Sequence, residues 1–180
     1  MTDSTPRSSV PLGSSAAGPA PSGPASAASG EPVAGSRPAP RQPLRLLLAA
    51  AAVYVVVGLA AGLFYRELTK LNGFEEGMPG QLGLAHTHLL ALGALVSLIV
   101  LALEKSFRLS TSRLFPWFFW IYNAGVVLTG AMLVWHGTLQ VLGAESSKMI
   151  AGIAGAGHML VGAGFVLLLL SLRASIRREG

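Results

Sequence analysis

Four histidines lie within or beside apolar segments of this 180-residue chain: His86, His88, His136 and His158. Imidazole is costly to place in hydrocarbon, so histidines inside membrane spans are rare and usually functional. Counting about 1.5 Å per residue along each segment places all four toward the same face of a bilayer. Histidines at similar depth on neighbouring helices predict a shared haem or metal ion.

The segments that carry these histidines are long enough to cross a membrane. The chain is 52% hydrophobic and only 12% charged, which is too apolar for a typical soluble domain. An apolar helix of about 20 residues spans the hydrocarbon core. The sequence therefore predicts an all-α integral membrane four-helix bundle in contact with the lipid bilayer, with transmembrane helices over residues 46–65, 81–103, 114–142 and 149–172.

Polar segments flank the predicted transmembrane domain, which covers residues 44–173. Residues 1–43 are rich in Pro, Ala, Ser and Gly, which is typical of a disordered tail and of proteins from high-GC bacterial genomes. Residues 174–180 form a short basic tail. Basic residues favour the cytoplasmic side, and they gather before the first helix, between the second and third, and after the fourth. We therefore expect a bacterial plasma-membrane protein with both termini in the cytoplasm.

Several function classes lack support in the composition. The net charge of +5 follows from these membrane-flanking residues, so it does not indicate nucleic-acid binding. The absence of cysteine excludes disulfides, thiolate metal sites and covalently attached c-type haem. All acidic residues are predicted to lie outside the hydrocarbon core, and no nucleophile–base pair or phosphate-binding loop is present. This pattern favours a non-enzymatic role.

The fourth predicted helix presents the clearest candidate ligand. His158 shares a helix face with small residues, among them Ala154, Gly155 and Gly162, and such a face admits either a neighbouring helix or a flat macrocycle. On the second helix, His86 and His88 point about 200° apart, so both cannot face one seam. His88 and His158 come out at similar depths, about 22 Å and 21 Å from the cytoplasmic ends of their helices.

Haem b held by two histidines is the leading interpretation, with His158 opposite His86 or His88 and with Arg66 placed to hold a haem propionate. Such a protein would serve electron transfer, haem sensing or haem handling, with a respiratory-chain protein as a candidate partner. A cofactor-free structural or assembly subunit, whose histidines make interhelical hydrogen bonds, is the first alternative. A copper ion bound by His86, His88, His136 and His158 is the second. The small-residue face also suits a homo-oligomer.

Three stretches of the chain carry a resemblance to a known family. Phe64–Glu67, Leu84–Leu90 and Gly152–His158 resemble segments of an uncharacterised bacterial family of four-helix membrane proteins, known only as a domain of unknown function. The resemblance covers roughly residues 44–172. It implies a membrane location and brings no established activity.

A second, more distant resemblance concerns only Ala85–His88. This stretch is similar to the Ala-His-Ala motif of haem-copper oxidase subunit I, in which the histidine binds the low-spin haem. The resemblance implies that His86 is a haem ligand, and on this ground we rank it ahead of His88. The chain departs from the oxidases because it has four helices rather than twelve and lacks their three copper-binding histidines. Oxygen reduction is therefore not implied.

Overall fold

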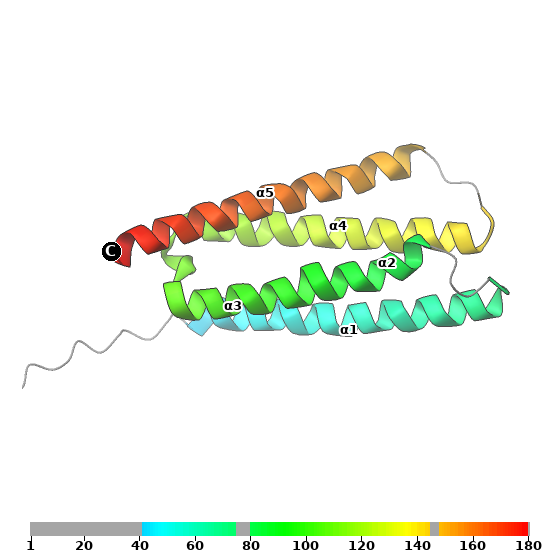
Figure 1. The fold of residues 1–180 in the computed structure, drawn as a ribbon, viewed down its shortest axis with the longest axis horizontal. Helices are drawn as coiled ribbons and strands as arrows, with labels where there is room; N and C mark the ends of the chain where they lie inside the picture. The colour runs from blue at the N-terminus through cyan, green and yellow to red at the C-terminus, as the bar shows by residue number, and fades with distance from the viewer. Residues whose placement is uncertain (1–40, 75–79, 145–147, 180) are drawn as a thin grey trace, which may run out of the picture. The chain divides into compact units, whose positions relative to one another are not determined.

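The structure, a computed structural model, describes residues 41–74, 80–144 and 148–179. The predicted disordered tail falls outside the described residues except for its last three positions, which belong to the first helix. Within the described ranges the chain is all-α and contains four helices long and apolar enough to cross a membrane. The predicted all-α fold with four membrane-spanning helices is thereby confirmed (Figure 1).

The first span is α1 (Arg41–Leu71). The second span (Gln81–Phe107) consists of α2 (Gln81–His88), the π-helical segment η1 (Leu89–Leu95) and α3 (Val96–Phe107). A short 3₁₀ turn, η2 (Leu109–Thr111), leads to α4 (Phe115–Val141), and α5 (Lys148–Glu179) completes the chain.

Three of the four spans extend beyond the predicted hydrocarbon segments because polar residues outside the core remain helical; α4 instead lies within its predicted range of 114–142. Gly73 and Gly143 adopt left-handed φ angles of 60° and 67° after the first and third spans. The amide of the following residue then bonds back to the last turn, as in Ala144 N to Leu139 O at 2.9 Å. This is the usual way in which a glycine ends a helix.

The four spans pack as two pairs that meet in the middle. Along its length α1 packs against the second span, and α5 packs mainly on α4. The second span and α4 join the two pairs, so that α5 and α1 are the outer members of the series seen in Figure 1. Glycines permit close contact within each pair: Gly93 lies against Tyr54, and Gly125 lies against Val161.

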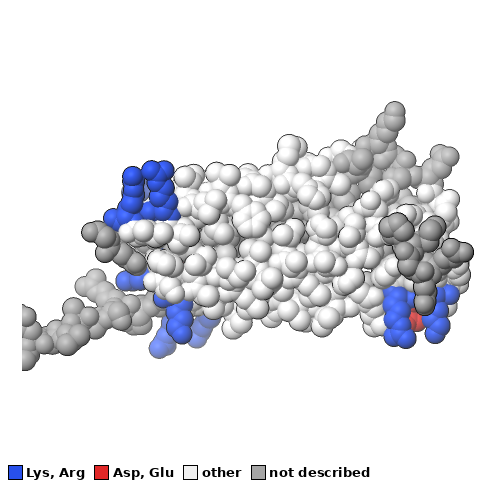
Figure 2. Space-filling model, viewed as in Figure 1, with Lys and Arg blue, Asp and Glu red and all other residues white. Residues whose placement is uncertain are grey.

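Basic residues mark the two ends of the described bundle and leave its side apolar. Figure 2 shows Lys and Arg gathered at the ends on the face in view, with uncharged residues between them. The end at which α3, α4 and the last turns of α5 meet carries most of them: Arg41, Arg45, Lys105, Arg108, Arg113, Arg173, Arg177 and Arg178. The uncharged belt is what a lipid-facing surface requires.

Candidate functional site

The structure brings two of the four histidines together. His88, at the end of α2, and His158, on α5, have ring centroids 6.2 Å apart with ring planes at 80°. They belong to different helix pairs, so their contact bridges the two halves of the bundle. His88 is half-buried and His158 is exposed at the side of the bundle.

Both rings of this histidine pair are held in the same way. His88 Nδ1 lies 2.9 Å from the carbonyl oxygen of Leu84, and His158 Nδ1 lies 3.0 Å from that of Ala154. A carbonyl can only accept, so Nδ1 carries the proton in each neutral ring and donates it. The Nε2 atoms therefore keep their lone pairs, which is the state in which histidine binds a metal.

The spacing of the pair suits a metal centre between two imidazoles. An imidazole nitrogen binds metals at about 2.0–2.1 Å, and the ring centre lies about 1 Å beyond it. Two imidazoles on opposite sides of one metal ion therefore have centroids about 6 Å apart. The 6.2 Å separation of His88 and His158 matches this distance.

Close packing of α5 on α4 determines where His158 faces. A Cβ added at Gly157 would lie 2.5 Å from Thr129 Oγ1, and one at Gly164 would lie 2.7 Å from Tyr122 Cβ. The face of α5 that contains these glycines is thereby held against α4. His158 is the next residue after Gly157, so its side chain points about 100° further around the helix axis. It therefore faces the second span, where His88 lies, rather than α4.

The face of α5 that carries His158 is not filled by protein. Gly155 and Gly162 lie three residues before and four residues after it, and a Cβ added at either would meet no atom within 4 Å. Glycines that pack no helix leave the backbone accessible to a flat ligand. This face of α5 therefore borders open space at the side of the bundle beside His158.

The structure places His86 on the other side of the second span. Its Cβ, Cγ and Cδ2 atoms lie 3.7–3.8 Å from the Cβ position of Gly62 on α1. Its Nδ1 is buried and has no hydrogen-bond partner among the described residues, and Nε2 is 3.5 Å from Thr87 Oγ1. His86 thus faces α1, whereas His88 faces α5. This agrees with the angle of about 200° between the directions of two side chains two residues apart on a helix.

The remaining candidates lie apart from the pair. His136 is half-buried on α4, seven residues and about 10 Å along the helix from Thr129. Arg66, on α1, is largely exposed, and its Nε atom lies 3.8 Å from Glu67 Oε1. In the described part of the chain no three His, Cys, Asp or Glu side chains come close enough to hold one metal ion. The four histidines accordingly do not form one shared metal site there.

Two residues beside the pair were not singled out from the sequence. Thr129 is 1% exposed, and its Oγ1 has no hydrogen-bond partner among the described residues. It lies against Gly157, next to His158. A threonine inside an apolar span carries no distinctive signal because its hydroxyl usually bonds to its own helix. Gly157 is the second of these residues. The sequence shows a glycine before His158, but its pattern does not indicate that this glycine contacts α4.

These features define a class of protein: an all-α chain with four membrane-capable helices and a histidine pair that bridges two of them. A family model described as "Protein of unknown function (DUF2871)" matches residues 44–175, so the chain belongs to this family. No curated protein and no solved structure matches the chain.

Proposed function

We propose that this protein binds haem b in the membrane through His88 and His158 and that it serves electron transfer. The observation that carries the proposal is the His88–His158 pair, with centroids 6.2 Å apart and each Nδ1 bonded to a backbone carbonyl. When bound, haem would supply a one-electron redox centre. Because two side chains of the protein would both hold the haem, we favour electron transfer over catalysis.

The surroundings of the pair support haem more than a bare metal ion. Zinc sites usually have three or four protein ligands, whereas two imidazoles suffice for haem because the porphyrin supplies the other four nitrogens. The free space at Gly155 and Gly162 gives a macrocycle a place to lie against α5. A copper ion held by the same two histidines is the second candidate, favoured over zinc because no carboxylate of the described residues joins the pair to make a three-ligand site.

The pairing of His158 with His88 also decides between the two candidate ligands on α2. The resemblance of Ala85–His88 to the oxidase motif supports His86, but His86 faces Gly62 on α1. His88 faces His158 directly. We therefore propose that His88 and His158 would hold the haem and that His86 is a half-buried residue of the α1 interface.

The test is a reduced-minus-oxidised absorption spectrum of the detergent-purified protein, expressed with ample haem. We expect sharp α and Soret bands that are lost in His88→Ala and His158→Ala. His86→Ala and His136→Ala are the matched controls, because they remove an imidazole of similar depth outside the pair, and they should retain the bands.

Other outcomes would contradict the haem proposal. Loss of the bands in His86→Ala but not in His88→Ala would assign the ligand to the oxidase-like position. A folded protein without a Soret band but with bound copper, lost in His158→Ala, would support the copper site. A folded protein with neither would leave the histidines a structural role in an assembly subunit.

We further propose a bacterial plasma-membrane location with both chain termini on the cytoplasmic side. The end of the bundle that holds the start of α1, η2 and the last turns of α5 is the more basic one, and basic residues are retained in the cytoplasm. The histidine pair then lies in the outer half of the membrane. A lipid-soluble or periplasmic redox protein is the kind of partner that can reach it.

A further inference from the structure

Two buried tyrosines from different helices contact the π-helical segment η1 at adjacent residues. Tyr54 of α1 is 5% exposed, and Tyr122 of α4 is 2% exposed. The ring of Tyr54 occupies the space in which Gly93 would carry a Cβ. The hydroxyl of Tyr122 donates a hydrogen bond to the carbonyl oxygen of Leu92 at 2.8 Å. The segment η1 is therefore held by one side chain of α1 and one of α4.

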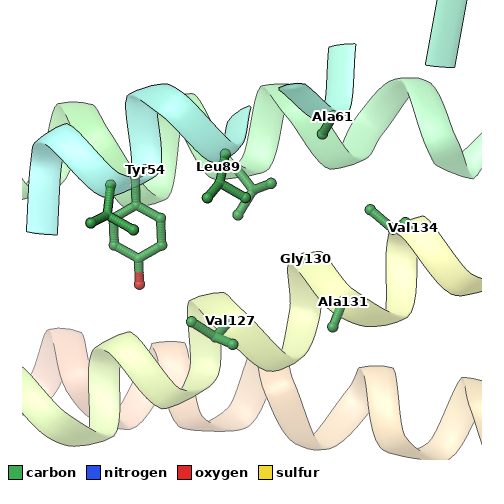
Figure 3. Close-up of a pocket in the computed structure, with 9 residues that line it drawn as sticks. Tyr54, Ala61, Leu89, Val127, Gly130, Ala131 and Val134 are labelled. Atoms are coloured by element: carbon green, nitrogen blue, oxygen red, sulfur yellow. The ribbon is translucent and has the colours of Figure 1, made fainter. Parts of the chain in front are cut away.

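The two tyrosine hydroxyls have different partners. Tyr54 donates to Asn123 Oδ1 of α4 at 2.8 Å, and Asn123 Nδ2 in turn donates to Phe119 O at 2.7 Å. Figure 3 shows Tyr54 reaching from α1 toward α4, with its hydroxyl oxygen at the far end of the ring. The Tyr54 hydroxyl thus joins α1 to α4, whereas the Tyr122 hydroxyl joins α4 to the backbone of η1.

The hydrogen bond from Tyr122 favours the π-helical form of η1. A carbonyl oxygen has two lone pairs, so Leu92 O can accept this bond in addition to one from its own helix. Conversion of η1 to an α-helix would rotate the residues on one side of it by about 100° relative to those on the other. Leu92 O would then move relative to α4, and the buried Tyr122 hydroxyl would lose its acceptor, which is unfavourable. Because η1 begins directly after His88, this bond also affects the direction of His88.

The same tyrosine determines how α5 packs. A Cβ added at Gly164 would lie 2.7 Å from Tyr122 Cβ and 2.9 Å from Tyr122 Cα. The Phe165 ring packs edge-on against the Tyr122 ring, with centroids 5.2 Å apart. Gly164 lies six residues after His158, about 9 Å along α5. Tyr122 therefore contacts both of the elements that position the histidine pair, η1 on one side and α5 on the other.

We infer that Tyr122 is the positioning residue of the His88–His158 pair. Its hydroxyl keeps η1 in the form that directs His88, and its ring and Cβ fix the place of α5, which carries His158. One side chain thereby keeps the two imidazoles in register. The inference concerns the pair itself, and only its consequence for haem rests on the proposed function.

Nuclear magnetic resonance of the haem-free full chain with labelled histidine tests the pair directly, since the chain contains only four histidines. We expect a nuclear Overhauser cross-peak between the rings of His88 and His158, whose centroids are 6.2 Å apart. Tyr122→Phe should lose this cross-peak, because it removes the bond to η1 while keeping the ring. Tyr54→Phe is the matched control: it removes a similarly buried hydroxyl that bonds α4 instead, and it should retain the cross-peak.

A pair of glycine substitutions tests the contact with α5 and does not depend on the folding of Tyr122→Phe. Gly164→Ala must move α5 away from Tyr122, so the cross-peak between His88 and His158 should be lost. Gly152→Ala is the control, because Gly152 lies six residues before His158 and a Cβ there would meet no atom within 4 Å. It should retain the cross-peak.

The outcomes separate this inference from the haem proposal. Retention of the cross-peak in Tyr122→Phe, its equal loss in Tyr54→Phe, or its absence from the unchanged protein would overturn the inference. In haem-loaded protein Tyr122→Phe should shift the midpoint reduction potential and Tyr54→Phe should not, because a displaced histidine distorts the haem. A chain that binds no haem but shows the expected cross-peak losses would refute the proposed function and support the role of Tyr122.

Discussion

At the residue scale, Gly157 controls how closely α5 approaches α4 beside the histidine pair. A Cβ at this position would lie 2.5 Å from Thr129 Oγ1 and 3.0 Å from Thr129 N. The backbone of α4 cannot move away without shifting the helix. Gly157 is therefore required for packing, whereas Gly155, two residues earlier, borders open space.

Gly157→Ala is expected to destabilise the protein by about 1–3 kcal/mol, because the methyl group overpacks the contact with Thr129. Gly155→Ala is the matched control and should be neutral or stabilising by up to about 1 kcal/mol, since alanine favours the helix. Unfolding by denaturant in detergent micelles measures both. Equal effects of the two substitutions would show that the close contact at Gly157 does not form.

A buried carboxylate closes the loop at the arginine-rich end. Glu104 is fully buried, and its oxygens accept hydrogen bonds from Ser110 N at 2.7 Å and Ser110 Oγ at 2.6 Å. The sequence predicted Glu104 to lie outside the hydrocarbon core, and nothing in its spacing showed that η2 would fold back over it. The carboxylate thereby fixes the turn between α3 and α4.

Glu104→Ala is expected to lower the free energy of unfolding by about 3 kcal/mol, because it leaves the half-buried amide and hydroxyl of Ser110 without their charged acceptor. Glu104→Gln keeps one acceptor oxygen and should cost about half as much. The exposed neighbour Lys105 supplies the control: Lys105→Gln should stay within about 0.5 kcal/mol of the unchanged protein. If Glu104→Ala behaved like Lys105→Gln, the proposed role in the turn would be wrong.

At the element scale, hydropathy was sufficient to predict the four spans but not the details inside them. Apolar runs mark the hydrocarbon thickness, so they gave no sign that α1 begins at Arg41 or that α5 continues to Glu179. The helical period showed that His86 and His88 point apart. Which one faces His158 depends on the packing of α1 and α5 around the second span, and that information is distributed over many residues.

The π-helical segment η1 was also absent from the sequence prediction. It begins directly after His88 and contains Gly93, whose Cβ position is occupied by the Tyr54 side chain. Wider π turns accommodate an extra residue and often occur at functional sites. In the second span this segment sets the rotation of α2, and thus of His88, relative to α3.

Deleting Ala91, an exposed residue of η1, should restore an α-helix and rotate His88 by about 100° relative to α3. We expect the haem bands to be lost while the far-ultraviolet circular dichroism remains helical. Ala91→Leu keeps the number of residues and should retain the bands. Retention of the bands after the deletion would mean that η1 does not orient His88.

At the scale of the whole molecule, the unequal charge of the two ends predicts the topology. Fusing a fluorescent protein after Gly180 should give fluorescent cells, because the basic end of the bundle stays in the cytoplasm. A periplasmic phosphatase fused at the same position should be inactive, and one fused after Gly73 should be active. The reverse pattern would place the histidine pair in the inner half of the membrane.

The two-pair packing of the spans has a consequence for biosynthesis. His88 belongs to the hairpin of α1 with the second span, and His158 belongs to the hairpin of α4 with α5. During translation the first hairpin enters the membrane with only one of the two ligands. A ligand held by the pair can therefore be loaded only after the last helix has been inserted, and its loading would report that assembly is complete.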